Sequence, residues 1–537
     1  MDITGGALIG GDRERTPPST VAGGGSFRAV NPATGGELEP AFVESGESEV
    51  ARAVAAAERA LEEYASLEPA ARAAFLRAIA DAIESLGDAL LERAREETGL
   101  PRGRLEAERG RTTAQLRLFA EVVEEGSWVQ ARIDPGDPAR RPAARPDIRR
   151  MLVPLGPVAV FGASNFPLAF SVGGGDTASA LAAGCPVVFK AHPGHPGTAE
   201  LTGRAVFAAA RAVDVPDGVF SLLQGWSHEL GLALVRHPGV KAVAFTGSLR
   251  AGRVLFEAGA TRPEPIPVYA EMGSVNPVFL LPSAATERAN ALAEGLAGSI
   301  MLGVGQFCTN PGVILGVAGE SLDRLGERLA DRFGGAEPGV MLYARLREGY
   351  DEGVARARSK GARSLAGATE PGRGAVATPT LLATGAARLI EDPELREELF
   401  GPASLLVTAR DVAELERVAE SLEGQLTATI HGTEAELLEH HRLVEILTRK
   451  AGRVIFNGFP TGVEVGHAMQ HGGPYPASTD GRTTSVGTAA IARFARPVCW
   501  QDFPQSALPP ELRDRNERGI WRLVNGAPTR EDVSPRL

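Results

Sequence analysis

The chain has 537 residues, a formal net charge of −11, and 43% hydrophobic and 23% charged residues. This length exceeds what one compact core holds, so two or more domains are expected. The acidic balance without a basic stripe disfavours nucleic acid as a partner. No apolar run approaches membrane-spanning length, and Met1 to Ser26 lacks the apolar core of a signal peptide, which disfavours a membrane or export role.

The three cysteines, Cys185, Cys308 and Cys499, are an odd and sparse set. Such a count argues against a disulfide framework and fits a reducing compartment. We therefore expect a cytoplasmic protein.

Residues 1–28 are rich in glycine, proline and charge, and we interpret them as a flexible lead-in. Apolar residues at helical spacing then predict two helices, one from Val50 to Tyr64 and one from Leu76 to Leu90. Residues 128–150 are rich in Pro, Arg and Asp without periodicity, which indicates a linker or a protruding arm.

From Pro157 onward, short β-rich runs alternate with Ala-rich helical stretches, which predicts parallel sheets covered on both faces by helices. The fold class is therefore α/β. The strands are expected first at residues 157–162, 186–190, 219–223 and 240–246 and then, in a second region from Gly273, at residues 277–281, 313–317, 404–408, 426–431 and 453–457.

Cys308 lies in a glycine-rich turn, Gly303 to Gly312, just before the strand that begins at Val313. Glycines let the backbone approach a ligand, and a thiolate is a good nucleophile. A buried structural cysteine is the alternative interpretation, and this segment alone favours it.

Two further segments carry groups that suit acyl chemistry. Glu271 stands in an otherwise apolar stretch, where burial would raise its pKa and suit it to act as a general base. Asn165 follows a strand, and its side-chain amide is a donor that can stabilise an oxyanion. A surface acid at a strand end and a turn before Pro167 are the alternatives.

Three segments carry groups that can bind a dinucleotide cofactor. Gly247 and Ser248 stand at a strand–helix junction, where N–H groups can face a diphosphate, although the G-x-G-x-x-G pattern is absent. Lys190 ends a strand, and ligands bind at the carboxyl ends of parallel strands. Glu398 precedes a tight turn and can accept both hydroxyls of a ribose. Each residue alone also fits an ordinary turn or surface position.

These motifs occur together and in one order, and from about residue 29 to its end the chain resembles the aldehyde dehydrogenase superfamily. The resemblance implies a Rossmann-type cofactor domain (29–127 and 151–272), a catalytic domain (273–481), and a small β oligomerisation arm with a tail (128–150 and 482–537). It also implies a homodimer or homotetramer.

By this resemblance Cys308 is the nucleophile, Glu271 the general base, and Asn165 with the Cys308 N–H the oxyanion hole. Lys190 and Glu398 would hold the cofactor riboses and Gly247 and Ser248 the pyrophosphate, with Phe400 of the Glu398 motif beside the cofactor. Many members carry a glutamate after the lysine that pairs with the ribose of NAD. Here residues 191–197 hold no acid, so NADP is favoured and NAD stays open.

Phe166, Phe307 and Phe459 are candidates for the walls of the aldehyde channel and fit a core role equally well. A carboxylated aldehyde would need an arginine there, which the sequence does not identify. His192 and His195 lack further ligands, so we interpret them as loop residues and expect no metal.

The segments 190–198, 305–312, 496–510 and 519–525 resemble those of α-ketoglutarate semialdehyde (2,5-dioxovalerate) dehydrogenases. This branch implies oxidation of that small-molecule aldehyde to 2-oxoglutarate through a cysteine thioester. An NADP-dependent dehydrogenase of fatty or other aldehydes, a CoA-acylating relative and a non-enzymatic member of the fold are the alternatives.

Overall fold

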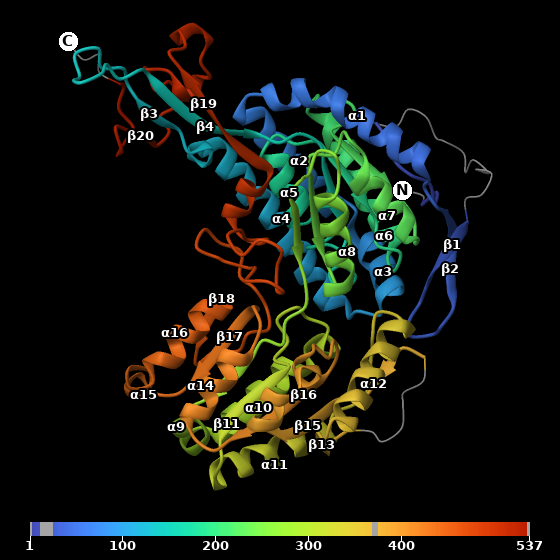
Figure 1. The fold of residues 1–537 in the computed structure, drawn as a ribbon. Coiled ribbons are helices and arrows are strands. Elements are labelled where there is room, and N and C mark those ends of the chain that lie inside the picture. The colour runs from blue at the N-terminus through green and yellow to red at the C-terminus, as the bar shows by residue number, and fades with distance from the viewer. Residues whose placement is uncertain (1–2, 11–24, 368–373, 534–537) are drawn as a thin grey trace.

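The strands of the protein form two large sheets that helices cover and a third sheet, of five strands, that projects as an arm (Figure 1). The structure is a computed structural model that describes residues 3–10, 25–367 and 374–533. Helices surround both large sheets, so the α/β class expected from the sequence is confirmed. None of the helices in these ranges is long and apolar enough to cross a membrane.

The first large sheet has five strands in the order β7-β6-β5-β8-β9, and every neighbouring pair is parallel. Its strands match the four predicted runs and add one more. They are β5 (Val158–Phe161), β6 (Val187–Lys190), β7 (Phe220–Leu223), β8 (Ala242–Thr246) and β9 (Val268–Glu271).

Side chains alternate between two apolar layers along these strands. Val158 and Val160 belong to one core cluster, which includes residues of α2, α4, α5 and α6, whereas Ala159 and Phe161 belong to another, which includes residues of α1, α7 and α8. The helices are α1 (Glu47–Ser66), α2 (Pro69–Ser85), α3 (Gly87–Thr98), α4 (Arg102–Glu125), α5 (Gly175–Ala182), α6 (Pro196–Ala212), α7 (His228–Arg236) and α8 (Leu249–Ala260).

The prediction of one continuous helix from Leu76 to Leu90 is wrong, because the helix is broken after Ser85. The helix α2 ends at Ser85, and α3 begins at Gly87, whose φ of +56° lies in the left-handed region. Glycine adopts this conformation at little cost, so the chain turns there while the apolar spacing continues into α3.

The second large sheet has seven strands in the order β13-β15-β16-β11-β10-β17-β18, parallel except at β13. Its strands are β10 (Val278–Leu280), β11 (Val313–Val317), β13 (Arg363–Ala366), β15 (Thr380–Gly385), β16 (Ala403–Ala409), β17 (Gln425–His431) and β18 (Ala451–Phe456). Its helices are α9 (Pro282–Glu287), α10 (Ala289–Met301), α11 (Glu320–Gly334), α12 (Ala344–Ser359), α13 (Ala386–Glu391), α14 (Val412–Ser421), α15 (Glu434–Glu439) and α16 (His441–Lys450).

The arm is a sheet in the order β19-β4-β3-β20-β21 that joins distant parts of the chain. It contains β3 (Arg132–Asp134), β4 (Ile148–Pro154), β19 (Ala495–Gln501), β20 (Arg522–Val524) and β21 (Ala527–Thr529). Two short pairs complete the strands, β1 (Ser26–Val30) with β2 (Glu37–Val43), and β12 (Gly339–Val340) with β14 (Val376–Ala377).

Part of the expected flexible lead-in packs tightly against the body. Leu8 is buried and pairs with Leu222 of β7, and the carboxylate of Glu200 accepts the backbone N–H groups of Thr4 and Gly5. A buried carboxylate needs such donors, so residues 3–10 are held in place and the expectation is wrong for them. Residues 11–24 lie outside the described residues.

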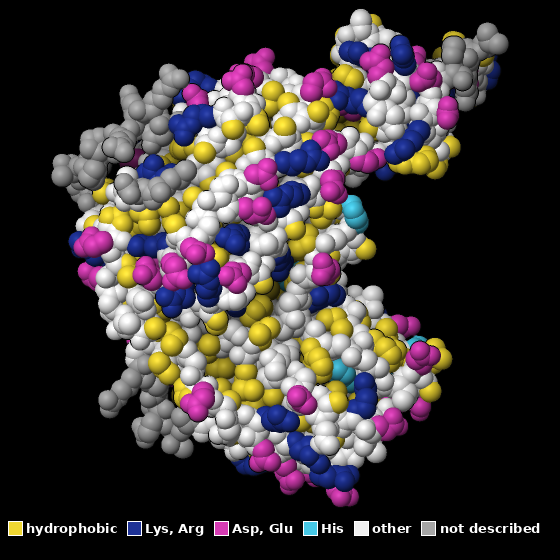
Figure 2. Space-filling model, turned by 180° about the vertical axis from the view of Figure 1, so that it is seen from behind, with side chains coloured by type: hydrophobic (Ala, Val, Ile, Leu, Met, Phe, Trp, Pro, Cys, Tyr) yellow, Lys and Arg dark blue, Asp and Glu magenta, His cyan; other side chains and the backbone are white. Residues whose placement is uncertain are grey.

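The two large sheets bring opposite edges to one region of the molecule. Lys190, Thr246 and Glu271 end strands at the carboxyl edge of the first sheet, where ligands bind in open α/β folds. The segments that carry Cys308 and Glu398 precede β11 and β16 and therefore lie at the amino edge of the second sheet. Figure 2 shows the surface hollowed between the two halves of the molecule.

Candidate active site

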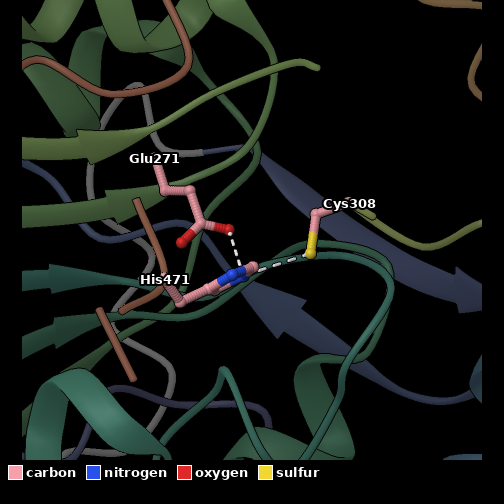
Figure 3. Close-up of side chains that lie close together, drawn as sticks. All are labelled: Glu271, Cys308 and His471. Atoms are coloured by element: carbon pink, nitrogen blue, oxygen red, sulfur yellow. Dashed lines mark hydrogen bonds and ion pairs between the residues drawn. The ribbon is translucent and has the colours of Figure 1, made fainter. Parts of the chain in front are cut away.

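A chain of contacts links Cys308, His471 and Glu271 (Figure 3). The Nε2 atom of His471 lies 3.4 Å from the Cys308 sulfur and 3.1 Å from a carboxylate oxygen of Glu271. The hydroxyl of Ser485 donates to the other oxygen of that carboxylate. Glu271 and His471 are buried, and Cys308 is half-buried, so the sulfur is the member nearest to solvent. Both contacts are made by the same nitrogen, so His471 can take a proton from the sulfur only in the tautomer that carries its hydrogen on Nδ1.

The loop that carries Cys308 is fixed by unusual backbone conformations and by one asparagine. Val304 and Gly305 both have positive φ, and a Cβ on Gly305 would lie 2.1 Å from the carbonyl oxygen of Gly401, so only glycine fits there. The side-chain amide of Asn276 donates to the carbonyls of Cys308 and Asn310, at 2.8 and 3.0 Å. These contacts hold the sulfur in place before any ligand binds.

Asn165 lies beside this loop, as the sequence predicts. Its side-chain Nδ2 donates to the carbonyl of Gln306, two residues before Cys308, at 3.0 Å. Its own carbonyl accepts a hydrogen bond from Arg104 of α4 at 2.8 Å. The structure therefore brings the amide of Asn165 to the segment of Cys308, on which an oxyanion site would depend.

The electrostatic surroundings keep Cys308 protonated in the absence of ligands. Burial raises the pKa of the Cys308 thiol well above its ordinary value, and Glu271 raises it further, whereas Arg111 and Arg453 lower it. A thiol is a weak nucleophile, so a base must take its proton when it reacts. His471 is in contact with the sulfur and can accept it.

The expectation that burial raises the pKa of Glu271 is wrong in its net direction. Burial does push this pKa upward, but His471, through its charge and its hydrogen bond, and the hydroxyl of Ser485 push it downward by more. Glu271 is therefore ionised in the free protein. An ionised carboxylate can still accept a proton from water.

The residues proposed for the dinucleotide lie around the carboxyl edge of the first sheet. Ser248 is the N-cap of α8, and its hydroxyl accepts the N–H of Ala251. The N–H of Gly247 donates to the carbonyl of Glu271, so this glycine is tied to the site and its N–H is occupied. Lys190 ends β6 in a buried position, and burial lowers its pKa to about 8.

Glu398 lies against the turn after β9. A Cβ on Gly273 would meet its carboxylate oxygen at 2.5 Å, so the glycine makes room for the acid. Burial raises the pKa of Glu398 to about 8, and the backbone N–H of Ser274 acts in the opposite direction. A helix N-terminus, a lysine and a carboxylate are the groups that a diphosphate and ribose hydroxyls need, so this set fits a nicotinamide dinucleotide. Phe400 is half-buried in the same segment.

Phe166 and Phe307 form one aromatic cluster, and Phe459 does not belong to it. The rings of Phe166 and Phe307 lie 5.3 Å apart, and Phe170 packs on Phe166. Phe459 packs instead against His431, at 5.3 Å, and over Gly295.

His192 and His195, the two histidines predicted to be loop residues, stack on each other, and His195 contacts the carbonyl of Ala163.

The residues from 20 to 496 match the model of the aldehyde dehydrogenase family. The chain belongs to this family. It is an oxidoreductase that acts on aldehydes with NAD(P), and two similar proteins carry a more specific name. The chain is 50% identical to alpha-ketoglutaric semialdehyde dehydrogenase 2 of Azospirillum brasilense, over 98% of this chain and 99% of the relative. It is 47% identical to alpha-ketoglutaric semialdehyde dehydrogenase of Acinetobacter baylyi, over 91% and 93%. The resemblance to that branch is confirmed.

Solved structures of other aldehyde dehydrogenases share the fold. Gamma-glutamyl-gamma-aminobutyraldehyde dehydrogenase of Burkholderia cenocepacia matches with a TM-score of 0.79 at 25% identity, covering 93% of this chain and 97% of that one. Betaine aldehyde dehydrogenase of Staphylococcus aureus, solved with NAD+, matches with a TM-score of 0.78 at 21% identity, covering 94% and 99%.

Sequence reasoning missed His471 and the face of α4 that carries Arg104, Glu108 and Arg111. His471 stands in a glycine-rich segment where a lone histidine carries little signal, and only the fold places it between Cys308 and Glu271. On α4, Arg104, Glu108 and Arg111 have i, i+4 and i+7 spacing and so share one face, a pattern that could have been noticed. The guanidinium of Arg104 lies 4.8 and 4.5 Å from the ring centres of Phe166 and Phe307.

The raised pKa of Glu398 predicts a change in how stability depends on pH. The folded protein holds the Glu398 proton more tightly than the unfolded chain does, so this residue makes stability fall as pH rises from about 4.5 to about 8. We expect Glu398→Gln to flatten the decline of the thermal midpoint across that window, measured by scanning calorimetry. Glu397→Gln, at the neighbouring exposed acid, is the control. Identical curves for Glu398→Gln and wild type would contradict the burial of this charge.

The same contacts that suit proton transfer also predict inhibition by zinc. Ligand atoms of Glu271, Cys308 and His471 all lie within 4.8 Å of one another, and thiolate, imidazole and carboxylate are the usual ligands of Zn²⁺. We expect low Zn²⁺ concentrations to stop aldehyde oxidation and a chelator to restore it. Co²⁺ should give a thiolate absorption band that His471→Asn weakens and that His467→Asn, at an exposed histidine, leaves intact. A band unaffected by His471→Asn would contradict this site.

Proposed function

We propose that this protein oxidises α-ketoglutarate semialdehyde to 2-oxoglutarate through a thioester on Cys308. The observation that carries the proposal is the contact chain from Cys308 through His471 to Glu271. It occurs in a chain that is 50% identical to a relative named for this substrate.

In the first half-reaction the Cys308 sulfur attacks the aldehyde carbon while its proton passes to Nε2 of His471, which accepts it in the tautomer that carries its hydrogen on Nδ1. Glu271, 3.1 Å away, stabilises the imidazolium that forms. The carbonyl oxygen becomes an oxyanion, which the Cys308 N–H and the second amide hydrogen of Asn165 would stabilise, because the first is bound to Gln306.

Bound NAD(P)⁺ supplies the acceptor for the hydride that leaves the former aldehyde carbon. Cys308 then holds the acyl group as a thioester. Glu271 takes a proton from a water molecule, whose oxygen attacks the thioester carbon, and the C–S bond breaks to release the acid and the Cys308 thiolate. The imidazolium of His471 returns the proton that restores the thiol, and Glu271 loses its proton to solvent. A cavity of about 20 Å³, lined by Glu271, His471 and Ser485 among others, lies beside this carboxylate and has room for about one water.

We further propose that the cofactor is NADP by preference. Residues 191–197, which follow Lys190, contain no acid, so no carboxylate in this segment repels a 2′-phosphate. Lys190 and Glu398 would hold the riboses, and Ser248 at the start of α8 would hold the diphosphate.

The division into a cofactor domain (29–127 and 151–272), a catalytic domain (273–481) and an arm with a tail is also a proposal, and so is a homodimer or homotetramer. Exposed apolar side chains support subunit contacts. They lie on the edge strand β18, at Val454 and Phe456, and in the tail that joins the arm, at Phe503 and Trp521.

The three free cysteines support a cytoplasmic location.

Substrate kinetics test the proposed function. We expect the highest kcat/KM for α-ketoglutarate semialdehyde with NADP, compared with succinate semialdehyde and a long-chain aldehyde, each with NAD and NADP. Acid product should form without CoA, because water attacks the thioester. A preference for the long-chain aldehyde, or a requirement for CoA, would overturn the proposal.

Pre-steady-state kinetics separate the roles of His471 and Glu271. We expect Glu271→Gln to retain a first burst of NADPH and to lose about 100-fold or more of steady-state turnover, because it blocks hydrolysis. His471→Asn should slow the burst itself, and Cys308→Ala should abolish it. Glu434→Gln, at an exposed acid of α15, is the control. If Glu271→Gln turned over like wild type, Glu271 would have no part in hydrolysis.

A further inference from the structure

Two arginines act on Cys308 without a carboxylate partner of their own. Arg111 lies on α4 and Arg453 on β18, and these are the cations whose charge lowers the pKa of the Cys308 thiol. Neither forms an ion pair with a carboxylate in the described part of the chain, and the Nε atom of each is buried without a hydrogen-bond partner. Buried guanidinium groups normally find an acidic partner.

Arg111 lies at the far end of an aromatic wall that leads to Cys308. Its guanidinium carbon is 5.5 Å from the ring centre of Phe170. Phe170 packs on Phe166 at 5.2 Å, and Phe166 packs on Phe307, which directly precedes Cys308, at 5.3 Å. These three rings therefore form a continuous apolar row between the guanidinium of Arg111 and the residue before Cys308.

The acids around Arg111 are engaged elsewhere. Glu108 accepts the backbone N–H groups of Leu168 and Ala169. Burial raises the pKa of Glu108, so its carboxyl group carries less negative charge with which to balance the charge of Arg111. Glu271 is bound to His471, and Glu464 is exposed to solvent. The charges of these acids act on Arg111, but none of them forms an ion pair with it among the described residues, so its guanidinium can still pair with a ligand.

Arg453 approaches from the second sheet and is rigidly held. Its Nη2 atom donates to the carbonyls of Pro460 and Gly462, at 2.7 and 3.0 Å. Carbonyls fix the direction of the guanidinium without neutralising its charge. The charges of the two arginines thus act on Cys308 from both halves of the molecule.

We propose that Arg111 and Arg453 form an anion subsite that binds the carboxylate at the far end of the aldehyde substrate, with Arg111 as the main contact. This inference rests on the proposed function and deepens it. Paired N–H groups of a guanidinium match a carboxylate, whereas an uncharged aldehyde leaves them without a partner. The overall charge of −11 disfavours acidic ligands, so local cations are needed to admit them.

The test compares α-ketoglutarate semialdehyde with pentanal, an uncharged aldehyde of the same chain length. We expect Arg111→Gln to lower kcat/KM for the semialdehyde by about 10- to 100-fold, mainly through KM, because a charged hydrogen-bonded pair is lost. Activity with pentanal should fall much less, because that reaction loses only the effect of the Arg111 charge on the Cys308 thiol, and its retention shows that the variant folds. Arg111→Lys should recover part of the loss. Arg102→Gln, at an exposed arginine at the start of α4, is the matched control.

Competition by glutarate separates this inference from the proposed function. Against pentanal, glutarate should inhibit the wild type, and Arg111→Gln should raise its inhibition constant by a similar factor. If wild type rejects the semialdehyde but Arg111→Gln still relieves glutarate inhibition, the proposed substrate is wrong and the subsite stands. Equal losses with both aldehydes, or glutarate inhibition that Arg111→Gln leaves unchanged, would overturn the subsite.

Discussion

The contact between the sulfur of Cys308 and the imidazole of His471 is the interaction around which the site is arranged. The sulfur belongs to a loop at the amino edge of one sheet, and Glu271, which holds the imidazole, ends a strand at the carboxyl edge of the other. Neither half of the molecule contains the whole site. Its geometry therefore depends on how the two halves meet, and the side chain of His471 lies between those of Glu271 and Cys308 (Figure 3).

Several energetically unfavourable backbone conformations near Cys308 hold this contact in place. Residues before Cys308 adopt positive φ values, one of them at the β-branched Val304, and such conformations persist only where the surroundings impose them. Asn276 also has a positive φ, and its side-chain amide donates hydrogen bonds to the carbonyls of Cys308 and Asn310. The strain and the buried polar contacts fix the sulfur in advance, which reduces the reorganisation needed at the moment of reaction.

The helix α4 contributes more to the site than its place outside both sheets suggests. Arg104 lies against the aromatic rings and holds the carbonyl of Asn165, and Glu108 binds the next turn of the same loop. Arg111 continues this face with a charge that has no carboxylate partner among the described residues. One helical face therefore positions the amide donor and also supplies the positive charge for an acidic substrate.

Local patterns predicted the strands well because each buried parallel strand is a short apolar run bounded by turns, as in β5, β6, β8 and β11. Cys308 stood out by its glycine-rich turn, Glu271 by its apolar surroundings and Asn165 by its place after a strand, and their roles came from the resemblance to a family whose motifs occur in this order. The break at Gly87 was missed because apolar spacing continues across it, and the pull of His471 on the pKa of Glu271 was missed because 200 residues separate the two in sequence.

The sequence by itself determined the α/β class, the strand positions and the chemical types of the reacting groups, because these follow from local hydrophobic periodicity and from residues beside strand ends. Only the tertiary structure decided which groups touch. Long-range packing places His471 between acid and sulfur and keeps Phe459 apart from the aromatic cluster. It also leaves Arg111 and Arg453 with no ion-paired acid among the described residues, because burial and charge are set by neighbours distant in the chain.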